Sequence, residues 1–266
     1  MSLGVETRTF TPLRAMRKDE FMGSFKIKDK ANVGYIVAGY PNLDTTREFL
    51  AHLDESKIDI LEIGVPYSDP IADGAVIFEA AQEALRGGAT IHEVFRLLRG
   101  VKTTKILVLL VYYNLIFSYG LHEFVAQAKE AGIAGLIVPE LPFEESYALF
   151  VECKRAGIAL IPLVSVTTSR PRLRKILARG SGFVYALASI GITGGNQIEH
   201  QRLENLISEV KKLTKKPVFV GFGVKTNADV KACKKLADGA IVGTSLVQAF
   251  KKGDIKEILG RVEEIF

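Results

Sequence analysis

Eight short apolar runs alternate with amphipathic segments along this 266-residue chain, and the alternation predicts an α/β fold of the (βα)8 TIM-barrel class. Eight strands favour a closed barrel over an open, doubly wound sheet. The hydrophobic fraction of 48% fits strands that are buried on both faces. Barrels of this class commonly reach this length as one unit, so we expect a single domain over residues 1–266.

The predicted strands are short runs rich in Val, Ile and Leu that lie between turn residues. In chain order they are Val33–Gly39, Asp59–Gly64, Lys105–Val111, Gly135–Val138, Ala159–Val164, Gly182–Leu187, Pro217–Gly221 and Gly239–Val242. Active sites of this architecture lie at the carboxyl ends of the strands, so the residues that end each run are the candidates for chemistry.

Helical patterns fill the intervals between these strands. Asp44 is the expected N-cap of a helix over Thr45–Ser56, because its carboxylate can accept a hydrogen bond from a free N–H of the first turn. Gly132 and Gly157 are expected where a helix end needs a positive φ. The other readable helices are Gly120–Gly132, Phe143–Gly157, Ile198–Leu213 and Thr226–Leu236.

Residues 1–30 are expected to form a polar N-terminal extension before the first strand. Within it, Phe21, Met22 and Phe25 have helical spacing, so Met16–Asp29 is predicted to be an extra helix that caps the bottom of the barrel. The extension has no apolar run of the kind that a signal peptide needs, and no stretch of the chain approaches the roughly 18 apolar residues of a membrane span. We therefore expect a cytoplasmic protein without a membrane partner.

Charge and cysteine content argue against several other classes of protein. The chain has 35 basic and 30 acidic residues, but its lysine clusters lack interleaved aromatic residues, so no nucleic-acid partner is predicted. Cys153 and Cys233 lie far apart outside any CxxC pair, and the four histidines have no metal-ligand spacing. Neither a disulfide framework nor a metal site is predicted.

The most informative segment is LEIGVPYSDPIADG, over residues 61–74, in which an apolar strand delivers Glu62 and a turn-rich loop carries Asp73. A carboxylate at the end of a buried strand is desolvated at a cost that proteins tolerate where a proton is transferred. A pocket of Glu62, Asp73 and Tyr35 suits a flat ligand with one polar edge. Two simpler interpretations stay open: Glu62 as the buried partner of a cation, and Asp73 as a turn residue. Tyr112 and Tyr113 are expected to pack.

Glycine-rich loops follow the last three strands and predict a phosphate site. Their residues are Gly191, Thr193, Gly194, Gly195, Gly221, Phe222, Gly223, Gly243, Thr244 and Ser245. Glycine lets backbone N–H groups approach an anion closely, and a helix that begins at Thr244 favours negative charge at its N-terminus. Simple turn chemistry is the alternative explanation.

These motifs resemble those of tryptophan synthase alpha subunits. The resemblance rests on LEIGVPYSDPIADG together with YIVAGYP, YYNLIFSYG, LIVPELPFEES, IGITG, GFGV and GAIVGTS, which occur in the family's order over nearly the whole chain after about residue 30. It implies a (βα)8 lyase that cleaves indole-3-glycerol phosphate by a retro-aldol reaction into indole and glyceraldehyde 3-phosphate.

The resemblance also implies a role for each site residue. Glu62 matches the general acid/base, and Asp73 matches the carboxylate that accepts the indole N–H hydrogen bond. The other matches are Tyr35 and Leu110 in the indole pocket, Tyr185 near the acid, Thr193 in a closing loop, and Gly194, Gly223, Gly243 and Thr244 as phosphate ligands.

The resemblance further implies an α2β2 assembly with a beta subunit that holds pyridoxal phosphate, and no cofactor in this chain. The partner surface would include the loop after the second strand and Glu140–Pro142. Ala75, Phe78 and Glu140 depart from the family's usual proline, glutamine and aspartate there, and loss of a proline loosens a loop. Ser189 also replaces an arginine that some members have.

Two alternatives to this activity stay open. Another phosphate-binding barrel, such as an indole-glycerol-phosphate synthase or a sugar-phosphate isomerase, needs a different set of acids, and synthases of that type use a lysine at a strand end. Only Lys225, beyond the seventh strand, comes near such a position. A degenerate subunit that only binds and activates a partner is the second alternative, but such a role makes no demand on Glu62 and Asp73.

Overall fold

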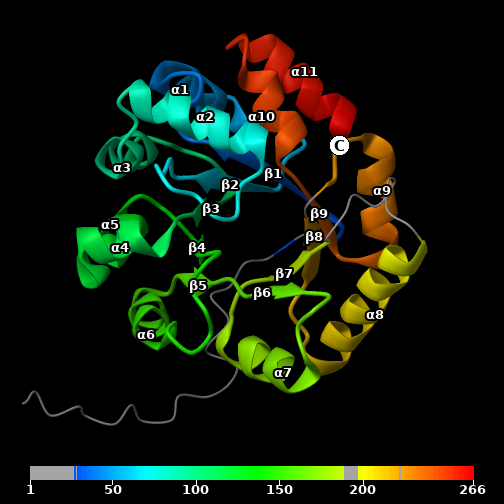
Figure 1. Cartoon of the computed structure of the whole chain (residues 1–266). Coiled ribbons are helices and arrows are strands. Elements are labelled where there is room, and N and C mark those ends of the chain that lie inside the picture. Colours follow the sequence, from blue (N-terminus) through cyan, green and yellow to red (C-terminus); the bar gives the residue numbers. More distant parts are fainter. Residues whose placement is uncertain (1–26, 28, 189–196, 222) are drawn as a thin grey trace, which may run out of the picture.

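The computed structural model describes residues 27, 29–188, 197–221 and 223–266, and within them a ring of parallel strands is surrounded by helices (Figure 1). The predicted N-terminal helix Met16–Asp29 lies outside the described residues except for Ile27 and Asp29. None of the described helices is long and apolar enough to cross a membrane.

Every predicted strand is present, with ends that shift by at most two residues. The observed strands are β1 Ala31–Val37, β2 Ile60–Gly64, β3 Ile106–Leu110, β4 Gly135–Ile137, β5 Ala159–Leu160, β6 Leu163–Ser165, β7 Val184–Leu187, β8 Val218–Gly221 and β9 Gly239–Val242. They form one parallel sheet in the order β5-β4-β3-β2-β1-β9-β8-β7-β6. The TIM-barrel prediction is confirmed by this topology.

The predicted fifth strand, Ala159–Val164, is divided into β5 and β6 because Pro162 has no N–H to donate to a neighbouring strand. β5 pairs with β4, and β6 pairs with β7. The two short strands at the ends of the sheet are thus consecutive in the chain. The connection also bonds to both sides, since Ile161 N donates to Leu136 O at 2.9 Å and Tyr185 N donates to Pro162 O at 2.9 Å. This piece of chain closes the barrel.

Helices follow the strands around the outside of the barrel (Figure 1). They are α1 Leu43–Ala51, α2 Ala75–Arg86, α3 Ile91–Arg99, α4 Tyr113–Tyr119, α5 Leu121–Glu130, α6 Tyr147–Ala156, α7 Arg170–Arg179, α8 Gln197–Leu213, α9 Asn227–Leu236, α10 Thr244–Phe250 and α11 Ile255–Ile265, with a 3-10 turn η1 at Leu53–Glu55. Gly132 and Gly157 have φ angles of +74° and +71°, as predicted for residues at helix ends.

The predicted N-cap Asp44 is wrong. Asn42 caps α1, and its side-chain oxygen accepts a hydrogen bond from Thr45 N at 2.8 Å, whereas Asp44 lies in the first turn. Asn and Asp are equally good N-caps, so the sequence pattern does not separate two candidates that lie two positions apart. The helix also ends at Ala51, and the chain to Ser56 continues as η1.

The inside of the barrel is filled by apolar side chains from the strands, which form a layer of Val33, Ile60, Val108, Phe183, Phe219 and Ile241. Side chains on a strand alternate between its two faces, so the residue two positions further along each strand points to the same side. Those residues are Tyr35, Glu62, Leu110, Tyr185, Gly221 and Gly243. The next layer toward the carboxyl ends therefore contains Glu62 and three of its predicted neighbours.

Candidate active site

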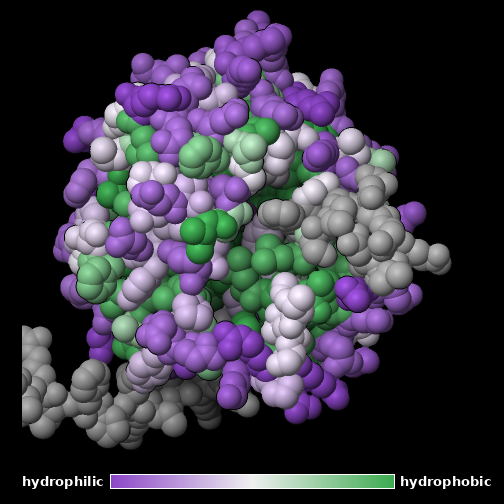
Figure 2. All heavy atoms as spheres, viewed as in Figure 1, coloured by the Kyte–Doolittle hydropathy of each residue, from purple (hydrophilic) through white to green (hydrophobic). Residues whose placement is uncertain are grey.

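The site lies where the strands end. In the space-filling view, hydrophobic side chains gather in a hollow near the middle of the face, inside a rim of hydrophilic residues (Figure 2). Such a hollow at the carboxyl ends of barrel strands is where this architecture places its chemistry.

Glu62 lies in the middle of β2, opposite Tyr35 of β1 in the strand register, and is 1% exposed. Burial raises the pKa of its carboxyl group from 4.5 to about 8, and the nearby charge of Asp73 adds to the rise. Its Oε2 atom is buried without a hydrogen-bond partner among the described residues. A cation partner would lower this pKa, so the structure argues against the simpler interpretation of Glu62 as half of an ion pair.

Asp73 lies in the loop between β2 and α2 and is half-buried. The Tyr112 hydroxyl donates a hydrogen bond to Asp73 Oδ2 at 3.2 Å. Burial raises the pKa of the Asp73 carboxyl group, while this hydrogen bond lowers it. Asp73 is thus more than a turn residue, since its side chain is held toward the barrel by a tyrosine from a different strand end.

Tyr35 and Tyr185 complete the group of residues around Glu62. A β-carbon on Gly64 would meet the Tyr35 hydroxyl at 2.2 Å, and one on Gly221 would meet the Tyr185 hydroxyl at 2.4 Å, so each ring crosses a strand where glycine leaves room for it. Burial, followed by neighbouring negative charge that includes Glu62, raises the pKa of both hydroxyl groups. Both tyrosines therefore stay neutral beside the carboxylates.

Leu110 is the last residue of β3 and packs against the apolar cluster inside the barrel. This position is compatible with its predicted place in an apolar pocket. The structure thus brings Tyr35, Glu62, Leu110 and Tyr185 into one layer, with Asp73 close enough to influence the titration of Glu62 and Tyr35.

Three of the predicted phosphate ligands, Gly223, Gly243 and Thr244, are among the residues that the structure describes. Gly223 follows β8 with a φ of +80°, and Gly243 directly precedes Thr244, the first residue of α10. Ser245 Oγ donates to Lys225 O at 2.9 Å, which ties the start of α10 to the loop after β8. A β-carbon on Gly243 would lie 3.5 Å from the Tyr35 ring. The loops after β8 and β9 therefore meet beside Tyr35. Thr193 and Gly194 lie outside the described residues.

The role of Tyr112 was missed by the sequence analysis, which predicted only packing. Its ring does pack, stacked on Tyr67 at 5.0 Å between centroids, but its hydroxyl also holds Asp73. Tyr112 lies two residues beyond Leu110, so the alternation of side chains along a strand could have placed both on the same face.

Glu140 lies just after β4 and joins two neighbouring loops, because its carboxylate accepts a hydrogen bond from the backbone N–H of Tyr113 at the start of α4. Burial raises the pKa of the Glu140 carboxyl group.

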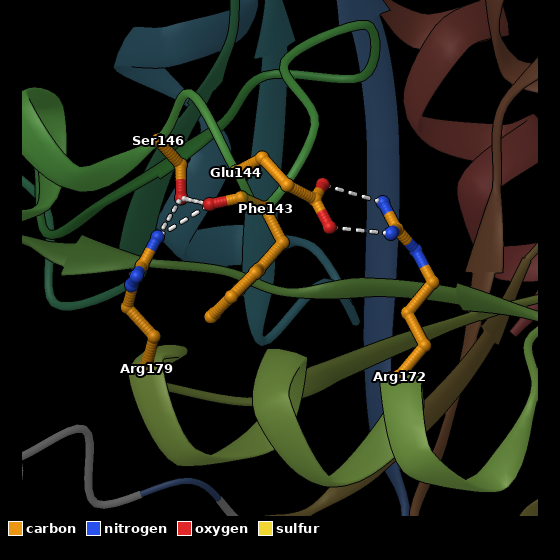
Figure 3. A network of polar contacts seen from close by, with 5 residues as sticks. All are labelled: Phe143, Glu144, Ser146, Arg172 and Arg179. Atoms are coloured by element: carbon orange, nitrogen blue, oxygen red, sulfur yellow. Dashed lines mark hydrogen bonds and ion pairs between the residues drawn. The ribbon is translucent and has the colours of Figure 1, made fainter.

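Two arginines of α7 contact Phe143 and Glu144, in the loop between β4 and α6 (Figure 3). Arg172 binds both oxygens of Glu144, and Arg179 lies over the Phe143 ring with its guanidinium carbon 3.8 Å from the centroid. Phe143, Arg172 and Arg179 also line a cavity of about 270 Å³.

The described residues contain no group of three or more His, Cys, Asp or Glu that could hold a metal ion. The chemistry available at this site is that of two carboxylates, one of them protonated at neutral pH, and neutral tyrosine hydroxyl groups beside an apolar layer. Such a set can donate a proton, accept it back and stabilise a positive charge.

The chain is similar to known proteins over most of its length. A family model described as "Tryptophan synthase alpha chain" matches residues 22–264. The chain is 56% identical over 239 residues to the tryptophan synthase alpha chain of Campylobacter jejuni, a match that covers 90% of this chain and 96% of the relative.

Solved structures give the same result. The alpha subunit of tryptophan synthase from Campylobacter jejuni superposes with a TM-score of 0.85 at 54% identity, covering 95% of this chain and all of the other. A chain of the tryptophan synthase complex from Pyrococcus furiosus gives a TM-score of 0.79 at 31% identity, covering 90% of this chain and 98% of that one.

Proposed function

The chain belongs to the tryptophan synthase alpha chain family, a family of lyases, and from this premise we propose that Glu62 and Asp73 carry out its reaction. The reaction is the retro-aldol cleavage of indole-3-glycerol phosphate into indole and glyceraldehyde 3-phosphate, the alpha reaction of tryptophan biosynthesis. The observation that carries the assignment of residues is the buried Glu62 carboxyl group, whose pKa of about 8 keeps it protonated at neutral pH.

A protonated Glu62 fixes the order of the two proton transfers. The carboxylic acid first donates its proton to carbon C3 of the indole ring, which leaves a positive charge on the ring and a carboxylate on Glu62. That carboxylate then removes the proton of the hydroxyl group next to C3. The bond between C3 and the glycerol carbon breaks, its electron pair neutralises the ring, and an aldehyde forms. Glu62 ends in its starting protonated state.

Asp73 acts on the charge that forms in the first step. Its carboxylate accepts a hydrogen bond from the indole N–H and stabilises the positive charge on the ring. The Tyr112 hydroxyl supports this role, because it donates to Asp73 Oδ2 and so favours the ionised form of that carboxylate.

The rest of the substrate has two contacts with the chain. The indole ring lies against Tyr35, Leu110 and Tyr185, which adjoin Glu62 in the same layer of the barrel. The phosphate group lies on the backbone N–H groups of Gly223 and Gly243 and on the Thr244 hydroxyl, at the N-terminus of α10. Thr193 and Gly194 are proposed to add a closing loop and a further phosphate ligand, on the family resemblance alone.

A beta-subunit partner follows from the family, which includes solved tryptophan synthase complexes. We propose an α2β2 assembly in which the beta subunit holds pyridoxal phosphate and this chain holds no cofactor. Three exposed apolar side chains support a partner surface that includes the Asp73 loop: Ile71 in this loop, Phe78 on α2 and Phe117 on α4 are 78%, 41% and 72% exposed. The assembly is proposed to be cytoplasmic.

Incubation of the full-length chain with indole-3-glycerol phosphate tests the reaction. We expect indole and glyceraldehyde 3-phosphate to appear in equal amounts, and to appear faster when a beta subunit is added. If neither product forms even with a beta subunit, the chain is a binding subunit, and the assignment of Glu62 and Asp73 is wrong.

A further inference from the structure

The loop that carries Asp73 is exposed over much of its length, yet it has contacts with two neighbouring segments. Residues 66–74 join β2 to α2, and Ile71 at the middle of the loop is 78% exposed. Gln82 of α2 donates to Ser68 O at 3.0 Å, which fixes one side of the loop. Residues at the start of α4 hold the loop near both of its ends, at Tyr67 and at Ala72 and Asp73.

Tyr67 is the first contact with α4. Its ring stacks on Tyr112 with 5.0 Å between centroids and 25° between planes, a favourable geometry for aromatic pairs. The side-chain amide of Asn114 donates to the Tyr67 hydroxyl at 3.1 Å. The ring of Tyr67 is therefore fixed both across its face and at its tip.

Tyr112 passes this restraint on to the catalytic carboxylate. Its hydroxyl accepts a hydrogen bond from Ala72 N at 3.1 Å and donates one to Asp73 Oδ2 at 3.2 Å. The side chain of Tyr112 is only 2% exposed, so it has little room to follow the loop if Tyr67 moves away. A continuous series of contacts thus runs from Asn114 through Tyr67 and Tyr112 to Asp73.

We propose that Tyr67 and Asn114 are positioning residues that hold the Asp73 loop in its reactive geometry before substrate binds. The proposal rests on the proposed role of Asp73. Both residues act through Tyr112, which donates the hydrogen bond to Asp73. We call these three side chains, Tyr67, Tyr112 and Asn114, the aromatic clamp.

The residue at position 75, an alanine, explains why the loop needs the restraint of the clamp. It is the first residue of α2, a position where proline is favoured. Gly74 before it has an extended backbone, with φ −77° and ψ 165°, which is compatible with a following proline. Without that proline the backbone of the loop is less restrained, and the side chains of the clamp supply the restraint instead.

The first test is amide hydrogen exchange in residues 66–74 of the full-length chain without ligand. Tyr67→Phe keeps the stacked ring and removes only the hydrogen bond to Asn114, and Asn114→Ala removes the same bond from the other side. We expect both variants to exchange faster in this segment than wild type. The matched control is Tyr119→Phe. It removes a tyrosine hydroxyl from α4, the helix that carries Asn114, at a ring that packs on Phe95 and Phe124.

The second test is kinetic. Loss of one neutral hydrogen bond corresponds to about a 2- to 10-fold change in the population of the held loop, so we expect kcat for cleavage to fall by about that factor in Tyr67→Phe. The KM for indole-3-glycerol phosphate should change less, because the phosphate site lies on other loops. Ala75→Pro added to Tyr67→Phe should restore both kcat and slow exchange.

Three outcomes would overturn the proposal. Unchanged exchange in both Tyr67→Phe and Asn114→Ala means that the clamp does not hold the loop. Faster exchange with unchanged kcat means that the loop is held but that Asp73 does not depend on it. An equal effect of Tyr119→Phe means that the response is not specific to the clamp. If wild type cleaves no substrate, the proposed function fails, while the exchange data still judge whether the clamp holds the loop.

Discussion

Replacement of Glu62 by glutamine tests the central physical feature of the site, a carboxyl group that stays protonated at neutral pH because it is buried. In the unfolded chain this group titrates near 4.5, whereas in the folded chain it titrates at about 8. Between these values the folded state binds one more proton than the unfolded state, so the free energy of unfolding falls as the pH rises. A glutamine has nearly the same shape and does not titrate.

The size of the effect follows from the shift. Each pH unit between 4.5 and 8 changes the contribution of Glu62 by about 1.4 kcal/mol, which amounts to about 3 kcal/mol at pH 7 and about 5 kcal/mol above pH 8. Relative to wild type, Glu62→Gln should therefore gain stability steadily from pH 5 to pH 8. The matched control is Glu123→Gln on α5, which makes the same substitution at an exposed position.

Urea unfolding followed by far-UV circular dichroism at pH 5, 6, 7 and 8 measures the difference between variant and wild type. A difference that is constant across this range would refute the reasoning, because it would mean that the pKa of Glu62 in the folded chain is not raised above its value of 4.5 in the unfolded chain. If Glu62 were instead stabilised as a carboxylate, as in an ion pair, the difference would change only below about pH 4.5.

Three further predictions concern other residues of the site and its loop. Tyr112→Phe should lower kcat by about 10- to 100-fold, because the lost hydroxyl donates to a charged acceptor, Asp73. A wild-type kcat in this variant would mean that the reaction does not depend on this hydrogen bond. Thr244→Val should raise KM for the phosphorylated substrate with a smaller change in kcat, and an unchanged KM would count against the phosphate site at α10. Ala75→Pro should raise the free energy of unfolding by about 0.4–1 kcal/mol, measured by denaturant titration, because it restricts the unfolded chain at a position whose folded geometry accepts proline.

The sequence predicts the barrel well because buried parallel strands are short apolar runs with clear turn residues between them. The differences arise where one residue decides a local detail. Pro162 divides the fifth strand, and Asn42 rather than Asp44 caps α1. Both details depend on a hydrogen bond that is made or lost at one residue, and an apolar pattern carries no such information.

For the site, too, the sequence predicts positions but not the contacts between side chains. The strand pattern alone places Glu62 in β2, and the family resemblance adds the roles of Glu62 and Asp73. The contacts of Asp73 with Tyr112, and of Tyr112 with Tyr67, join residues about 40 positions apart and become visible only once β2 and β3 lie side by side. The raised pKa of Glu62 likewise depends on how completely the other strands bury it.

The most direct test of the account is the single-turnover rate of indole release from indole-3-glycerol phosphate, at saturating full-length chain with a beta subunit present, for wild type, Glu62→Gln and Glu123→Gln. The account predicts that Glu123→Gln matches wild type and that Glu62→Gln is slower by at least about 100-fold, the usual contribution of a positioned general acid or base. A Glu62→Gln variant that releases indole within a few-fold of the wild-type rate would contradict the assignment of Glu62 as the group that moves the protons.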